Sequence, residues 1–243
     1  MQRIAKLAWT LSFNLIVIVL IITVLTVTVA APQAARAGGL NIDFGSQFVA
    51  PSGAFAAAAN QPGFWNEITT PGVSAGLKDL SGLTTGVSID VVADTLGGFS
   101  GTSATDDVAR LLNDNFYSFP QQPWRITLTG LSDGLYDVYA YAPANPNVGT
   151  GGFTVNGIPV AAFPGASTLI ENASWKRISN VNVAAGSMIL QGTDPTDFSG
   201  LSGLQLVPEP SAAITWTFTT IIVAAGRLTR CRRALSRTPA TIP

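Results

Sequence analysis

The 243-residue chain is predicted to contain one all-β domain between two apolar terminal segments. Two observations predict this class. The middle of the chain alternates short apolar runs with clusters of glycine, proline, asparagine, aspartate and serine, which is the pattern of short strands joined by turns. The long apolar stretches are confined to the two ends, and basic residues lie next to each of them. We therefore expect a β domain flanked by two hydrophobic helices.

Nine segments are predicted to be β-strands, because each combines alternating or continuous apolar side chains with turn-forming residues at its borders. They cover residues 40–44, 87–92, 124–129, 135–142, 153–155, 158–162, 175–183, 187–191 and 201–207. Trp124 shares one face of its strand with two aliphatic residues, Ile126 and Leu128, so we expect its ring in the core.

Two local signals lie between these strands. Asn156 and Gly157 separate two apolar runs, and both tolerate the positive φ angles of a type I′ turn, so they predict a hairpin. Residues 105–107 supply a cap and acidic groups immediately before an apolar pattern at 108–112. This order predicts one short helix, because acidic groups are favourable at a helix N-terminus.

The N-terminus has the form of a signal peptide. Arg3 and Lys6 precede an apolar run over residues 7–31. Small residues suited to signal peptidase then surround the expected cleavage point, at Ala35, Ala37 and Gly38. The apolar run is longer than the usual secretory signal, so an uncleaved membrane anchor stays open as an alternative.

The C-terminus has three parts in a fixed order. A proline-containing motif comes first and consists of Val207, Pro208, Glu209, Pro210 and Ser211. An apolar run of about 15 residues follows over 212–226, shorter than the about 20 that span a bilayer. A basic stop ends the series with Arg227, Arg230, Arg232 and Arg233. This tail is either a sorting signal or a single-pass anchor, and the basic residues are expected on the cytoplasmic side of the membrane.

Charge and composition exclude several classes of function. Residues 38–207 carry five basic and thirteen acidic side chains, a net charge of −8, so no nucleic-acid partner is expected. The chain has no histidine, which excludes histidine-dependent nucleophiles and imidazole metal sites. Its one cysteine, Cys231, lies in the basic tail, so the domain is expected to be stable without a disulfide.

No cofactor and no catalytic residue are predicted. Structural calcium could be held by carboxylates, but no run has the spacing of a calcium loop. The aspartates considered as oxygen ligands are Asp43, Asp79, Asp194 and Asp197. A glycosidase needs two carboxyl groups facing each other across a cleft. The domain has two glutamates, Glu67 and Glu171, and the sequence places neither against an aspartate.

Strand alternation indicates a candidate ligand-binding face. In the 135–141 segment, Asp137, Tyr139 and Tyr141 share one face, and Trp175 belongs to the polar face of its own strand. Aromatic rings stack on the apolar face of a sugar, and a carboxylate accepts hydrogen bonds from its hydroxyls. The alternative is that these rings pack under a loop or a second layer of the structure.

The tail resembles the PEP-CTERM sorting signal, which implies recognition and processing by an exosortase after delivery through the inner membrane. The domain resembles exported proteins of planctomycete type that combine such tails with a galactose-binding-like jelly-roll β-sandwich. The matching segments are residues 40–45, 64–66, 77–79, 86–88, 111–114, 126–131, 134–141, 153–157 and 203–206. Carbohydrate binding is implied only by analogy with the fold.

Three regions follow: a signal peptide over 1–37, an exported domain over 38–206 and a sorting tail over 207–243. We expect a non-catalytic surface or matrix protein that binds extracellular polysaccharide and lies transiently in the inner membrane. Its expected partners are signal peptidase and exosortase. Two alternatives are a structural envelope or matrix protein without a glycan ligand and, third in order, a polysaccharide hydrolase.

Overall fold

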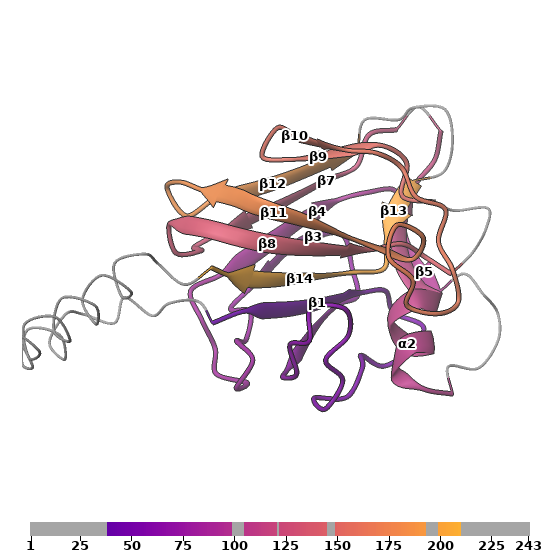
Figure 1. Cartoon of the computed structure of the whole chain (residues 1–243), viewed down its shortest axis with the longest axis horizontal. Helices are drawn as coiled ribbons and strands as arrows, with labels where there is room; N and C mark the ends of the chain where they lie inside the picture. The colour runs from indigo at the N-terminus through magenta and orange to yellow at the C-terminus, as the bar shows by residue number, and fades with distance from the viewer. Residues whose placement is uncertain (1–37, 99–104, 121, 145–148, 193–198, 210–243) are drawn as a thin grey trace, which may run out of the picture. The chain divides into compact units, whose positions relative to one another are not determined.

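The computed structural model describes residues 38–98, 105–120, 122–144, 149–192 and 199–209. The expected terminal helices, the cleavage residues Ala35 and Ala37, Pro210, Ser211 and the basic stop lie outside these ranges. The described residues form two large β-sheets, a smaller third sheet and one short helix (Figure 1). The predicted all-β jelly-roll sandwich with one short helix is therefore confirmed.

The first sheet, which we call sheet A, has five strands in the order β11-β8-β14-β1-β2. Its pairs are antiparallel except for β1 and β2, which are parallel. Its strands are β1 (Leu40–Phe44), β2 (Trp65–Ile68), β8 (Gly134–Tyr141), β11 (Trp175–Val183) and β14 (Gly203–Pro208).

The second sheet, sheet B, has six strands in the order β10-β9-β12-β7-β4-β3, all antiparallel. Its strands are β3 (Gly72–Ala75), β4 (Ser88–Val92), β7 (Arg125–Thr129), β9 (Phe153–Val155), β10 (Ile158–Val160) and β12 (Met188–Gly192). The β9–β10 hairpin turns at Asn156 and Gly157, whose φ angles are 46° and 81°, so the predicted turn is confirmed.

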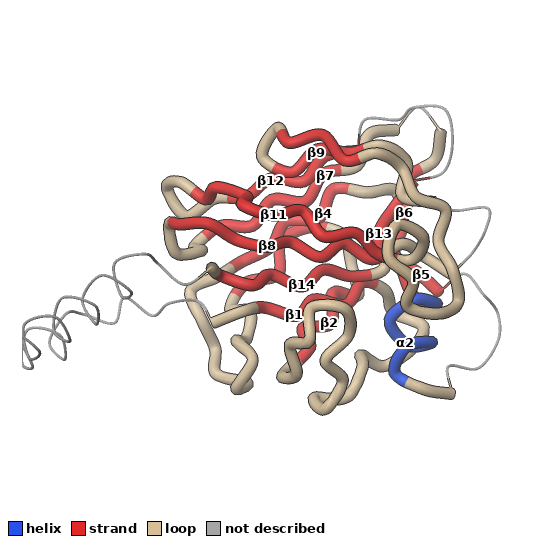
Figure 2. Tube along the Cα trace, in the orientation of Figure 1, coloured by secondary structure: helices blue, strands red, loops and turns tan. Residues whose placement is uncertain are grey.

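A small sheet and the helix lie at one end of the sandwich (Figure 2). The sheet consists of β13 (Ser199–Leu201), β6 (Asp114–Ser118) and β5 (Thr95–Gly98). The helix, α2 (Asp107–Asn113), is capped by Asp106, whose carboxylate accepts a hydrogen bond of 2.8 Å from the Ala109 N–H. The predicted helix and its acidic cap are confirmed.

The main core fills the space between sheets A and B. Alternate residues of each strand point inward, as Ile89, Ile126 and Leu190 do from sheet B and Val138 and Leu204 do from sheet A. Trp124 is completely buried at the end of this core, and its ring meets Phe116 edge-on. Its indole N–H donates a 2.9 Å hydrogen bond to the Ser199 hydroxyl. The prediction that Trp124 is a core residue is confirmed.

The structure differs from the predicted strands in number and in borders. Five strands were not predicted: β2, β3, β5, β6 and β13. The predicted segment 201–207 is divided, since Leu201 ends β13 and the last strand runs over Gly203–Pro208. Two residues of the proline motif, Val207 and Pro208, therefore belong to β14, and the Glu209 N–H donates to the Leu135 carbonyl at 2.8 Å.

Within the described ranges, no helix combines the length and the apolar character that crossing a membrane requires. The two apolar terminal runs lie outside these ranges, so their predicted helices stay predictions.

Candidate functional site

The outer face of sheet A carries the residues predicted to bind a ligand. Asp137, Tyr139 and Tyr141 share this face, as the alternation predicted, whereas Val138 and Ala140 point into the main core. Trp175 and Arg177 lie on the neighbouring strand, opposite Tyr141 and Tyr139 in the register of β8 and β11. The structure thus brings the four predicted residues together. Whether they bind a ligand stays a prediction.

Tyr141 is completely buried on this face. Its hydroxyl donates to the Gln205 side-chain oxygen at 2.5 Å and accepts from the Ala58 N–H at 2.9 Å. Burial raises the pKa of this phenol well above its ordinary value. Tyr141 therefore holds the 56–59 segment against the sheet and presents no surface to a ligand, which favours the packing alternative for this residue.

Tyr139 and Trp175 are half-buried and lie beside each other. Their ring centroids are 5.9 Å apart, and the planes are inclined by 34°. Both rings pack against a second apolar cluster that contains Leu111 and Leu112 of α2. Each ring is half-buried, so this pair offers only part of its surface to a ligand.

Asp137 is 7% exposed and forms an ion pair with Arg177 of the adjacent strand. The Asp137 carboxylate raises the pKa of the Arg177 guanidinium, first by accepting its hydrogen bond and then by its charge. One carboxylate oxygen, Oδ1, has no hydrogen-bond partner. Asp137 is thus occupied in a structural ion pair and is not directed at a free surface.

An amide network covers the middle of the same face. The Asn41 side-chain oxygen accepts hydrogen bonds of 2.9 Å from both Gln61 and Gln205. Gln205 also donates to the Ala56 carbonyl at 3.2 Å. All three side chains are buried, so their hydrogen bonds attach residues 56–61 to β1 and β14 and close this part of the face to solvent.

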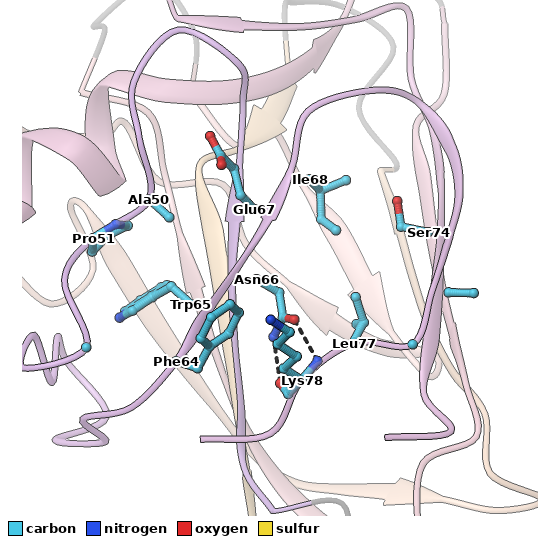
Figure 3. Close-up of a pocket in the computed structure, with 13 residues that line it drawn as sticks. Ala50, Pro51, Phe64, Trp65, Asn66, Glu67, Ile68, Ser74, Leu77 and Lys78 are labelled. Carbon is cyan, nitrogen blue, oxygen red and sulfur yellow. Dashed lines mark hydrogen bonds between the residues drawn. The ribbon is translucent and has the colours of Figure 1, made fainter. Parts of the chain in front are cut away.

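A groove of about 580 Å³ lies between edge strands β2 and β3, and we call it the β2–β3 groove (Figure 3). It was not predicted, although Phe64–Asn66 stood out in the sequence, because a hollow between two sheet edges leaves no periodic signal. Phe64 is 37% exposed at its wall, and the Lys78 ammonium lies 4.6 Å from the centre of its ring. Glu67 lines the other end of the groove.

Asn66 is a further polar residue of the groove, and its side chain is already engaged. Asn66 donates from its amide nitrogen to the carbonyls of Asn41 and Lys78, and its oxygen accepts from the Lys78 N–H at 2.7 Å. Its side chain therefore holds β2 to the 76–78 segment. The Glu67 carboxylate and the Lys78 ammonium remain as the charged groups that a ligand in this groove could reach.

The aspartates considered for calcium have different surroundings. Asp79 is a turn residue, and hydrogen bonds from the Ser81 hydroxyl and from the N–H groups of Ser81 and Leu83 lower its pKa. Asp194 and Asp197 lie outside the described residues. Asp43 is completely buried, and neither carboxylate oxygen has a hydrogen-bond partner. In the part of the chain that the structure describes, no group of three acidic, histidine or cysteine side chains is arranged to hold a metal ion.

Comparison with known proteins finds no matching family model and no matching curated protein. Among solved structures, a mutant of Bacteroides uniformis beta-glucuronidase 2 aligns over 71% of this chain and 18% of its own, with 14% identity and a TM-score of 0.44. The chain thus spans less than a fifth of that enzyme's length.

Two smaller domains also align with this chain. The CBM36-1 domain of a xylanase from the hindgut metagenome of Trinervitermes trinervoides aligns over 50% of this chain and 98% of its own, with 12% identity and a TM-score of 0.31. A CBM32-3 domain from a Clostridium perfringens family 31 glycoside hydrolase aligns over 49% and 91%, with 12% identity and a TM-score of 0.30. All three TM-scores lie below 0.5, so no ligand or activity is transferred from these proteins.

Proposed function

We propose that the chain is an exported, non-catalytic protein of the cell surface or extracellular matrix that binds polysaccharide through the β2–β3 groove. The observation that carries this proposal is an exposed aromatic ring in a groove that also offers a carboxylate and an ammonium group. The groove volume of about 580 Å³ falls within the range of about 300–1,000 Å³ typical of small-molecule sites.

Phe64, Lys78 and Glu67 supply complementary contacts for a sugar. The Phe64 ring can stack on the apolar face of a pyranose, and the charged groups can donate to and accept from its hydroxyls. Glu67 is the only carboxylate among the described residues that line the groove. Glycoside hydrolysis uses a pair of carboxyl groups, so this lining supports binding without turnover.

Few contacts of this kind give weak binding. Each stacked ring and each charge-assisted hydrogen bond contributes about 1 kcal/mol or slightly more, and association entropy is subtracted from the sum. We expect a dissociation constant on the order of 0.1–1 mM for one site. Retention on a polymer would then depend on many copies of the protein meeting many repeats of the polysaccharide.

Affinity electrophoresis of the full chain through gels that contain polysaccharide tests the proposal. Phe64→Ala should abolish the retardation that the wild-type chain shows. Phe119→Ala is the matched control, since Phe119 is an exposed phenylalanine that does not line the groove. Retardation that survives Phe64→Ala but is lost in Tyr139→Ala places the site at the predicted Tyr139–Trp175 pair instead.

Absence of retardation by any polysaccharide, together with self-association of the chain, would favour a structural matrix protein. Release of reducing sugar ends from a polysaccharide would contradict the non-catalytic proposal. Each measurement uses the full chain, because the tails are part of the protein as it is made.

Export and exosortase sorting belong to the same proposal, and they rest on the order of the proline motif, the apolar run and the basic stop in the sequence. In a host with the sorting enzyme, a tag after Pro243 should be lost while a tag near Gly38 is kept. A single membrane-extracted species that retains both tags would establish a permanent anchor instead.

A further inference from the structure

A second groove lies on the outer face of sheet B, and we call it the sheet-B groove. Outward side chains of β4 and β7 form its floor, and one aliphatic side chain stands on each side, Val73 of β3 and Ile189 of β12. Its volume of about 490 Å³ falls within the range of about 300–1,000 Å³ typical of small-molecule sites. It shares no lining residue with the β2–β3 groove, so it is a separate site.

The register of sheet B aligns four lining residues in one row across the groove. The row consists of Val73, Asp90, Thr127 and Ile189, each paired with the next on the neighbouring strand. Val73 is 73% exposed and Ile189 is 41% exposed, so aliphatic surface borders the polar floor on both sides. Because β4 and β7 lie between these two side chains, the groove runs along the strands and suits an extended ligand.

Arg125 is an exposed guanidinium at one end of the groove floor. The other basic residues in the described ranges are engaged, since Arg110 and Arg177 form ion pairs and Lys78 and Lys176 lie over aromatic rings. The Arg125 side chain has no ion pair, hydrogen bond or ring contact with the residues that the structure describes. Its planar fork of N–H donors is therefore free to bind a carboxylate through two hydrogen bonds.

Asp90 supplies a negative charge on the neighbouring strand. Its carboxylate is partly exposed and has no ion pair or hydrogen bond within the described ranges. Asp90 is opposite Thr127, and Arg125 is two residues from Thr127 along β7. This offset corresponds to about 7 Å along the strands. The floor thus presents a carboxylate and a guanidinium that are separated and are not paired with each other.

We propose that the sheet-B groove binds a short zwitterionic peptide of about two residues between these two charges. An extended chain spans about 3.3–3.6 Å per residue, so the ends of a dipeptide are about 7 Å apart, which matches the offset of Asp90 and Arg125. The terminal ammonium donates to Asp90, and the terminal carboxylate accepts from Arg125. The Thr127 hydroxyl is placed to bond the peptide group, and Val73 and Ile189 can contact apolar side chains of the ligand.

The lining favours a zwitterion over a sugar or a polyanion. None of the described residues that line this groove is aromatic, so the ring stacking proposed for Phe64 has no counterpart here. An anionic polymer would bring negative charge to Asp90 as well as to Arg125, which is unfavourable. A ligand with one ammonium and one carboxylate satisfies both side chains. The inference does not depend on whether the β2–β3 groove binds a glycan.

Saturation-transfer NMR of the full chain with alanyl-leucine, in the absence of any polysaccharide, tests this site. We expect a Kd on the order of 1 mM, because both charges are partly in solvent. The acetylated and amidated form of the same dipeptide should not bind, and free leucine should bind at least about fivefold more weakly, because it cannot span the offset. Arg125→Gln and Asp90→Asn should each weaken alanyl-leucine binding at least about fivefold.

Glu171→Gln is the matched control, because Glu171 is an exposed acid that does not line the groove, and its affinity for alanyl-leucine should equal that of the wild type. Circular dichroism checks that each variant is folded, and if one charge variant is not, the other decides. No saturation transfer to alanyl-leucine, equal binding of the blocked dipeptide or of free leucine, or unchanged affinity in a folded Arg125→Gln or Asp90→Asn chain would overturn the proposal.

Discussion

Asp137 and Asp43 lie on the same outer face of sheet A, and both are buried, yet their surroundings are opposite. Asp137 is 7% exposed and is paired with Arg177, whereas Asp43 is fully buried and has Asp114 and Glu67 as its charged neighbours. Asp137 is neutralised by its own chain. The fold thus stabilises one carboxylate internally and leaves the other dependent on a proton from solution.

The largest effect should come from removing the unpaired charge. At pH 7, Asp43→Asn should raise the free energy of unfolding by about 1–3 kcal/mol, because the amide carries no charge and can donate to the neighbouring carboxylates. Urea unfolding followed by tryptophan fluorescence measures this. Destabilisation by Asp43→Asn would mean that the carboxylate already has a partner.

The second effect concerns pH. In the folded chain the pKa of Asp43 is raised above 3.8, so the folded state holds a proton that the unfolded state has released. The stabilisation from this group is complete below about pH 4 and is lost as pH rises through its folded pKa. The free energy of unfolding should therefore decrease as pH rises from about 4, with a shallower slope in Asp43→Asn. Equal slopes for the two chains would contradict a raised pKa at this carboxyl.

The third prediction concerns Asp137, the carboxylate that is paired with Arg177. Asp137→Asn keeps an acceptor for the Arg177 guanidinium but removes the negative charge opposite it, and it should lower the free energy of unfolding by about 1 kcal/mol. Arg177→Met should cost more, because it leaves a buried carboxylate unpaired. The double variant should recover part of that loss. If the two single losses simply add in the double variant, the ion pair contributes no coupling energy.

Much of the fold could be predicted from the sequence where the pattern was long or chemically specific. The alternation over β8 and the Asn156–Gly157 turn gave correct strands and a correct hairpin. β2 and β3 have four residues each, too few for a clear period of two. β6 begins with Asp114 and Asn115, which usually indicate a turn, although here both are buried in a strand.

The site was harder to predict because periodicity identifies a face but not what covers it. In β1, Asn41 and Asp43 alternate with apolar residues, which indicates a half-exposed strand, but every residue of β1 is buried. The 56–61 segment covers Asn41 and also buries Tyr141 through hydrogen bonds from far along the chain. Such coverage depends on tertiary contacts that strand alternation does not encode.

The smallest effect should come from Glu209. Its charge also raises the pKa of Arg177, but by less than the charges of Asp137 and Tyr139 do. It follows the last strand and belongs to the proline motif, where its N–H bonds to Leu135. Glu209→Gln keeps this backbone contact and removes a charge that water and salt can screen. We expect a change below about 0.5 kcal/mol in the free energy of unfolding. A loss as large as that of Asp137→Asn would show that Arg177 is shared between two carboxylates. Glu209, at the start of the tail, would then belong to the ion pair that distinguishes Asp137 from Asp43.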